Sequence, residues 1–260
     1  MFFRSPALPH LESRRASHSR ACYRPHSHPT LSIGAVDGGA SVFSGAGTAP
    51  VLLRPGSVVW IPAECVHACN PLPGRDWSYQ MLHVELDWLR TQQPELAALA
   101  GNARSSDDPA LHAHYCAMNA LLFSAATPAA KNEAVLTFLR SFALADATPL
   151  PSVPVKGRVD PRLPALLDWL QHSARQDVPL DELAARAGMG RYQLIRAFRN
   201  ATGMAPRAWQ LNRRINASRR LLRDGRSLAA IAQDQGFADQ AHFQRMFKAH
   251  TGTTPGHYRR

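Results

Sequence analysis

The stretch GFADQAHFQRMFK, residues 236–248, decides the fold of the C-terminal part, because it repeats an earlier stretch of the chain in outline. Several apolar and helix-ending residues recur at a spacing of 49 or 48 positions. The recurring pairs are Phe198 and Phe247, Gly203 and Gly252, and Pro206 and Pro255 at 49, with Leu183 and Ile231, and Gly188 and Gly236, at 48. Such self-similarity indicates two copies of one supersecondary unit.

Each copy has the parts of a helix-turn-helix. A short helix is predicted at 180–187 and again at 228–235, and each precedes a glycine that suits the left-handed residue ending a helix. A second helix is predicted at 191–201 and at 239–250, with apolar residues four apart that face a core. The Arg-rich stretch from 206 to about 224 predicts a long helix that holds the two units about one DNA turn, roughly 34 Å, apart.

The charge of the chain is concentrated in this C-terminal part. The whole protein has a formal net charge of +11, and residues 160–260 carry +9 of it, from 17 Lys and Arg against 8 Asp and Glu. Such a distribution favours nucleic acid or an anionic membrane as partner. The excess is almost all Arg, whose fork matches phosphates and guanine edges, which favours nucleic acid. A basic surface without a partner is the alternative.

Residues 159–260 resemble the DNA-binding domain of AraC/XylS-type transcription regulators. The resemblance is carried by residues 236–248 and by GTTPGHYR at 252–259. It implies double-stranded DNA as the partner, with RNA polymerase as a second partner. An activator is the expectation, and repression stays open.

The resemblance also implies which side chains read DNA. Arg196 and Arg245 have the chemistry for guanine and Gln240 for adenine, whereas Ile195 and Ala241 offer only an apolar contact, such as one to a thymine methyl. Each Arg could instead contact a phosphate. The predicted DNA-binding residues are Tyr192, Ile195, Arg196, Arg199, Gln240, Ala241, His242, Arg245 and Lys248.

The N-terminal part predicts a different architecture, a small sandwich or barrel of short strands over residues 10 to about 84. The expected strands lie at 32–36, 51–53, 58–61 and 79–84, with turns at 38–39, 45–47 and 55–56. From Asp87 to about Leu144 the pattern becomes helical, and Asp107-Asp108-Pro109 is typical of a helix start. These helices could cover the domain's own core or form the face of a homodimer.

Three segments of the N-terminal part resemble the cupin-type sensor domain of the same family. They are RPHSH at 24–28, LRPGSVVWIP at 53–62 and HACN at 67–70. The fold class is therefore α+β multidomain: a cupin-like effector-sensing and dimerisation domain at 1–146, a Pro-rich linker at 147–158 and the DNA-binding domain at 159–260. A small-molecule effector is implied as a partner.

Histidines and cysteines are the candidate effector residues. The expected pocket residues are His26, His28, Trp60, His67 and Cys69. The candidate metal ligands are His26, His28, Cys65, His67 and Cys69, because residues two apart on a strand share a face and these ligand types suit a zinc-like ion. No Asp or Glu follows within 29–34, where metal cupins have an acidic ligand, so no cofactor is expected. A bound metal, an effector pocket and a buried histidine pair with structural cysteines stay as alternatives.

The sequence therefore predicts a ligand-responsive transcription regulator and not an enzyme. One alternative is a cupin enzyme, such as a metal-dependent dioxygenase or isomerase, with a DNA-binding tail. Another is a DNA or membrane binder without sequence preference. Four cysteines imply no dense disulfide framework, and no apolar run of about 18 residues occurs. A cytoplasmic protein without a membrane partner is expected.

Overall fold

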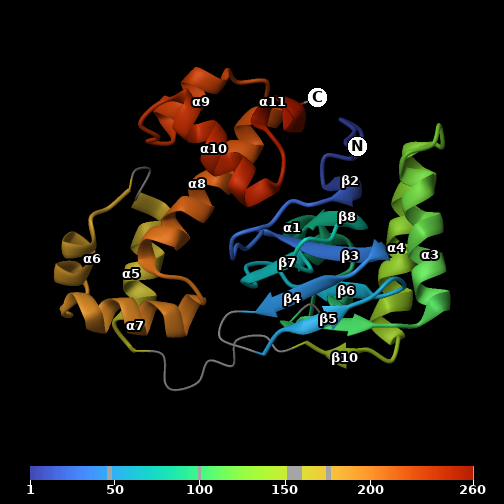
Figure 1. Ribbon diagram of the computed structural model, residues 1–260, viewed down its shortest axis with the longest axis horizontal. Helices are drawn as coiled ribbons and strands as arrows, with labels where there is room; N and C mark the ends of the chain where they lie inside the picture. Colours follow the sequence, from blue (N-terminus) through green and yellow to red (C-terminus); the bar gives the residue numbers. More distant parts are fainter. Residues whose placement is uncertain (46–48, 99–100, 151–159, 174–176, 260) are drawn as a thin grey trace.

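The computed structural model describes residues 1–45, 49–98, 101–150, 160–173 and 177–259. A β-rich N-terminal domain lies beside a helical C-terminal domain (Figure 1). In this view the helices α3, Pro109–Leu122, and α4, Pro128–Leu144, cover one side of the β-rich domain. The C-terminal helices lie against its other side. No helix among the described residues combines the length and apolar character that crossing a membrane requires.

Two antiparallel sheets build the N-terminal domain. The larger has the order β1-β2-β8-β3-β6-β9-β10, and the smaller has the order β5-β4-β7. The strands are β1 Phe2–Phe3, β2 Leu11–Ser19, β3 Thr30–Gly39, β4 Ser41–Gly45, β5 Val51–Leu53, β6 Val58–Ile61, β7 His67–Pro71, β8 Trp77–Glu85, β9 Arg104–Ser106 and β10 Thr148–Pro149. All four predicted strands are present. The predicted turn at 45–47 extends outside the described residues.

Alternation along β3 explains why this sheet has two different faces. Leu31, Ile33 and Ala35 join the core beneath α3 and α4. Ser32, between them, points to the opposite face, where its hydroxyl lies 2.9 Å from His83 Nδ1. The helices α3 and α4 therefore cover their own domain's core, and the Tyr115 hydroxyl fixes α3 by donating to the carbonyl of Ile33 at 3.0 Å.

The chain between Glu85 and α3 contains α1, Leu86–Gln92, and α2, Pro94–Ala98, before it returns to the large sheet as β9. Asp108 caps α3 by accepting from the amide of Ala110 at 2.8 Å, as the acidic residue before proline predicted.

The predicted linker begins later than residue 147. Thr148–Pro149 forms β10, which pairs with β9, and Leu150 is buried in the N-terminal domain's core. The Leu150 amide donates to the carbonyl of Ala103 at 2.8 Å. Residues 148–150 thus belong to the N-terminal domain despite Pro149, because an edge strand tolerates the missing N–H. The rest of the predicted linker lies outside the described residues.

The C-terminal domain consists of two helix-turn-helix units joined by one helix. Its helices are α5 Leu163–Ser173, α6 Leu180–Arg186, α7 Arg191–Thr202, α8 Pro206–Arg223, α9 Leu228–Asp234, α10 Gln240–Thr251 and α11 Pro255–Arg259. Gly188 and Gly236 have φ of +60° and +68°, the left-handed conformation expected after α6 and α9.

Each unit has its own apolar core, and α8 contributes to both. Leu194 and Phe198 of α7 pack with Trp209 near the start of α8. Phe243 of α10 packs with Ile215 further along the same helix. Because α8 is buried at both ends, the two units have a fixed separation.

Candidate DNA-reading surface and effector pocket

The second helix of the first unit, α7, divides into a buried and an exposed face. Leu194 and Phe198 are fully buried. Tyr192, Arg196 and Arg199 are exposed, and the Tyr192 side chain is 90% exposed. Ile195 is half-buried at the border of the two faces. The predicted DNA contacts of this unit therefore lie on one accessible side of α7.

The equivalent helix of the second unit, α10, begins with a side-chain cap. Asp239 accepts from the amide of His242 at 2.6 Å, and the His242 ring accepts from the amide of Ala238 at 3.3 Å. His242 is half-buried and fixes the turn before the helix. The other predicted contacts of this unit are exposed: Gln240, Ala241, Arg245 and Lys248. In both units the polar face of the second helix is thus exposed from its N-terminal turn onward, where it can enter the major groove of DNA.

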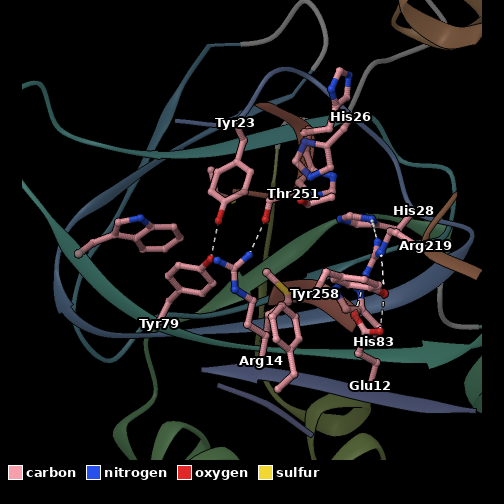
Figure 2. Close-up of a pocket in the computed structure, with 16 residues that line it drawn as sticks. Glu12, Arg14, Tyr23, His26, His28, Tyr79, His83, Arg219, Thr251 and Tyr258 are labelled. Carbon is pink, nitrogen blue, oxygen red and sulfur yellow. Dashed lines mark hydrogen bonds and ion pairs between the residues drawn. The ribbon is translucent and has the colours of Figure 1, made fainter. Parts of the chain in front are cut away.

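A pocket opens where the β-rich domain meets the helical domain, and Figure 2 shows side chains from both parts around it. It contains about 600 Å³ of space, part of it open to solvent. Arg14, Tyr23 and Tyr79 form one wall, where the two tyrosine hydroxyls lie 2.5 Å apart. Arg14 donates to the carbonyl of Thr251, at the end of α10, at 2.6 Å. The opposing wall contains Arg219 of α8.

The structure brings most of the predicted effector residues to this pocket. His26, His28, His67 and Cys69 line it. Trp60 does not, and its assignment to the pocket is wrong: it is fully buried on the opposite face of the large sheet, stacked on Phe142 with ring centroids 5.2 Å apart.

Three of the histidines that line the pocket, His26, His28 and His67, form a close group. One ring nitrogen of each lies within 4.8 Å of the others, and neither Cys65 nor Cys69 belongs to this group. Cys65 precedes β7 in a turn, so it does not share a strand face with His67. Burial lowers the pKa of His67 to about 4, and burial together with His67 lowers that of His26. The imidazoles are therefore neutral at physiological pH.

The hydrogen bonds of His28, unlike those of His26 and His67, fit a metal ion poorly. His26 and His67 each bond a backbone carbonyl through Nδ1, at 2.7 and 2.9 Å, which leaves Nε2 with a lone pair. His28 Nδ1 instead lies 3.0 Å from the Arg219 guanidinium, so it accepts and its Nε2 carries the proton. A metal would need that proton removed and would also meet the positive charge of Arg219.

A buried carboxylate, Glu12 of β2, stands at the base of the pocket. It accepts from Arg219 at 2.9 Å, from Arg4 at 2.9 Å and from the Tyr258 hydroxyl at 2.6 Å. Burial opposes its ionisation, but the guanidiniums of Arg219 and Arg4 outweigh burial and hold the pKa of Glu12 well below its usual value. The Glu12 carboxylate thus links three parts of the chain: the N-terminal strands, α8 and α11.

Glu12 was not predicted from the sequence. The acidic ligand of metal cupins follows the His-x-His pair, and residues 29–34 contain no Asp or Glu, whereas the carboxylate beside these histidines comes from a strand that precedes them. Arg219 was predicted only as one charge of the Arg-rich helix. The opposite charges of the two residues give no signal in the sequence, because 207 positions separate them.

Further contacts hold the two domains together. The Asn212 and Asn216 side-chain amides donate to the carbonyl of Ser27 at 3.2 and 2.9 Å. Val66, from the turn before β7, packs into the core of the first helix-turn-helix unit. The N-terminal strand also contributes, since the ring centroids of Phe2 and Tyr258 lie 5.4 Å apart.

This fold and pocket define a two-domain DNA-binding transcription regulator whose N-terminal domain binds a ligand. Residues 8–139 match the AraC-like ligand binding domain, and residues 183–260 match a helix-turn-helix domain. The chain belongs to the AraC family of transcription regulators and is not an enzyme.

Individual relatives agree with this assignment. The chain is 37% identical over 100 residues to the transcriptional activator NphR of Rhodococcus sp, covering 38% of this chain and 29% of NphR. It is 24% identical over 240 residues to the uncharacterized HTH-type transcriptional regulator YbfI of Bacillus subtilis, covering 90% and 86% of the two chains. The chain thus spans less than a third of NphR and most of YbfI.

Among solved structures, the fold is similar to ToxT of Vibrio cholerae. The apo form of a ToxT point variant superposes with a TM-score of 0.60 at 12% identity, covering 96% of this chain and 97% of ToxT. Wild-type ToxT bound to an unsaturated fatty acid gives a TM-score of 0.58 at 12% identity, covering 96% and 94%.

Proposed function

We propose that this protein regulates transcription in response to a small molecule that binds between its two domains. The observation that carries this proposal is the composition of the pocket wall. Arg14, Tyr23 and His67 come from the N-terminal domain, whereas Arg219 and Thr251 come from α8 and α10. A ligand in this space contacts the DNA-binding domain directly. It therefore binds with different free energy when the two domains are docked and when they are apart, and such a difference is what couples ligand binding to DNA binding.

The chemistry of the pocket favours a ligand with an apolar body and a carboxylate or another acceptor group. Trp77 and Tyr79 stack with centroids 4.1 Å apart and supply aromatic surface. Arg14 and Arg219 supply two cations against the single carboxylate of Glu12, so the net charge of the wall is positive. The fatty acid bound to ToxT combines the same two features. The neutral imidazoles add uncharged hydrogen-bonding groups.

The exposed faces of α7 and α10 are the proposed reading surfaces. We assign Arg196 and Arg245 to guanine, Gln240 to adenine, and Ile195 and Ala241 to apolar base contacts. Tyr192, Arg199 and Lys248 contact the backbone or flanking bases, while His242 positions the start of α10 through its bond to Ala238. The shared helix α8 sets the distance between the two sub-sites.

Two partners beyond DNA and ligand belong to the same proposal. RNA polymerase is the expected partner of an activator, and the relative NphR is named a transcriptional activator. A homodimer would use the outer surface of α3 and α4, where Leu144 is 88% exposed. Sedimentation of the full chain and of residues 159–260 tests this homodimer. The full chain should self-associate, and residues 159–260 alone should not.

The experiment that tests the main proposal is sequencing of genomic DNA fragments retained by the full-length protein at moderate salt. Discrete sites with two sub-sites about one helical turn apart are expected. Retention should change when long-chain carboxylic acids are added, and an Arg14→Met variant should lose that response while it still binds the same sites. Uniform, salt-sensitive retention by both the full chain and residues 159–260 would overturn the proposal.

A further inference from the structure

A second cluster of ligand-type side chains lies on the face of the large sheet opposite the effector pocket. His112 and Cys116 stand one turn apart on α3 and are half-buried toward the sheet. Asp37 lies where the pairing of β3 with β8 shifts register, between Val36 and Gly38. This bulge directs the Asp37 side chain to the helix, so the three residues meet at the contact between α3 and β3.

The distances within this cluster match those of a coordinated ion. Asp37 Oδ1 lies 3.5 Å from His112 Nε2 and 3.9 Å from Cys116 Sγ, and Sγ lies 3.8 Å from the same His112 nitrogen. Tetrahedral ligands with metal bonds of about 2.0 Å to nitrogen or oxygen and about 2.3 Å to sulfur stand roughly 3.3 to 3.6 Å apart. Each side chain would need to move by only a few tenths of an ångström.

We propose that Asp37, His112 and Cys116 bind a transition-metal ion, with zinc as the best match to this donor set. A thiolate, an imidazole and a carboxylate are the ligands that zinc and cobalt accept in four-coordinate sites, with a fourth position left for water. Magnesium and calcium, which prefer oxygen ligands, do not fit a sulfur and nitrogen pair. On binding, the Cys116 thiol proton is released to solvent and the sulfur becomes a thiolate ligand.

A buried amide supports the ligands from behind. Gln80 Nε2 donates to Asp37 Oδ1 at 2.8 Å and lies 3.3 Å from Cys116 Sγ. The Gln80 carbonyl accepts from Asn119, whose own carbonyl accepts from the Ser13 hydroxyl at 2.6 Å. This chain fixes the amide with its nitrogen toward the cluster, so the carboxylate and the sulfur both accept. Donors of this kind orient metal ligands and raise metal affinity.

An ion pair between Asp37 and His112 alone would not require the thiol. A metal site does require it, and Cys116 Sγ lies within 3.9 Å of both Asp37 and His112. The Gln80 amide, which donates to Asp37 and to Cys116, supports the same arrangement. The site is independent of the effector pocket, since Gln80 faces away from the pocket residues Tyr79 and Met81 that flank it on β8. A bound ion would tie α3 to the sheet.

Titration of the full-length protein with Co²⁺ tests the site. One equivalent should give thiolate-to-cobalt charge-transfer absorption in the near ultraviolet and the intense visible bands of a four-coordinate ion, and Zn²⁺ should remove both. Cys116→Ser, a near-isosteric change, should abolish the charge-transfer absorption. His112→Ala and Asp37→Asn should weaken binding, and Gln80→Leu should lower the affinity about 10- to 100-fold.

Matched controls distinguish this cluster from the pocket. Cys65→Ser and Cys69→Ser remove the thiols beside the pocket histidines, and Cys22→Ser removes an exposed thiol. All three should retain the full cobalt spectrum. Circular dichroism and thermal unfolding without metal show whether each variant folds. Absence of a cobalt spectrum in the parent protein, or its loss in Cys65→Ser or Cys69→Ser but not in Cys116→Ser, would overturn the proposal.

Discussion

Arg219 of α8 donates to Glu12 of β2 at 2.9 Å, and both side chains are largely buried, with 14% and 4% of their surfaces exposed. This ion pair joins the DNA-binding domain to the ligand-binding domain at the base of the effector pocket. Arg219 also donates to His28 at 3.0 Å, so the same guanidinium contacts the pocket wall. A ligand that attracts Arg219 therefore competes with Glu12 for it.

Breaking this ion pair should loosen the docking of the two domains. Glu12→Gln retains the size of the side chain but leaves Arg219 buried without a counter-charge, a change that costs about 3–5 kcal/mol in buried pairs. The thermal midpoint should fall, and small-angle scattering should show a larger radius of gyration. Arg219→Met in the same chain removes the unpaired charge and should restore part of the midpoint. If Glu12→Gln melts and scatters like the parent, the pair does not hold the domains.

Arg245 and Lys248 should affect DNA binding in different ways, although both are exposed on α10. Arg245→Ala should cost about 1–3 kcal/mol and relax preference at one base position. Lys248→Ala should weaken binding equally across sequences and reduce the salt slope by about one. Binding to a panel of operator variants at several salt concentrations separates the two. A uniform loss in Arg245→Ala would place this side chain on a phosphate.

Acid should destabilise the protein through its buried imidazoles. Burial lowers the pKa of His67 to about 4, and burial with Arg219 nearby lowers that of His83 to about 3. Unfolded histidines titrate near 6.5, so between the two values the unfolded chain binds more protons than the folded one, and stability falls as the pH falls. For His67 alone the full loss is about 3 kcal/mol.

Denaturant unfolding between pH 7.5 and 4 measures this dependence. His67→Gln, which cannot titrate, should flatten the curve below pH 6.5, and His114→Gln on α3, whose ring is outside the pocket, serves as a control. Equal slopes for His67→Gln and the parent would contradict the assignment.

Gly252, which ends α10, should tolerate a side chain worse than Gly225 does. Both have positive φ, +67° and +78°, so alanine strains each backbone similarly. A Cβ at Gly252 would lie 2.5 Å from the Tyr23 hydroxyl in the pocket wall, whereas a Cβ at Gly225 would have no atom of the described residues within 4 Å. Gly252→Ala should therefore lower the thermal midpoint more than Gly225→Ala and alter ligand binding, which calorimetry with a long-chain acid would detect. Equal midpoints would mean that α10 moves freely relative to Tyr23.

The helical domain could be predicted from sequence because its signals are local. Repeated spacing, glycines after the first helices and apolar residues four apart determine α6, α7, α9 and α10 within a residue or two. The sheet was predicted only in part. Strand β2, with the sequence LESRRASHS, was not predicted because its composition is mostly polar, although it lies between β1 and β8 in the large sheet.

Trp60 shows why the pocket could not be assigned residue by residue. All four residues of β6 are buried, since apolar layers cover both of its faces. A strand of that kind has no alternation of polar and apolar side chains, so the sequence does not reveal which face each side chain occupies. The histidines were easier, because polar residues inside a domain are found where they have hydrogen-bond partners or line a cavity.

The end of α10 carries a constraint on how this protein can diverge. Arg245 faces outward from this helix, while Thr251, less than two turns further on, accepts a hydrogen bond from Arg14 in the pocket. Gene duplicates that acquire a new inducer by substitutions near Thr251 would disturb promoter choice at the same time. Tyr23 is under the same constraint, because its hydroxyl lies against Gly252. Substitutions at Trp77, which stacks on Tyr79 of the same strand, leave the reading helix intact. Inducer preference is thus free to evolve only at pocket residues that do not contact α10.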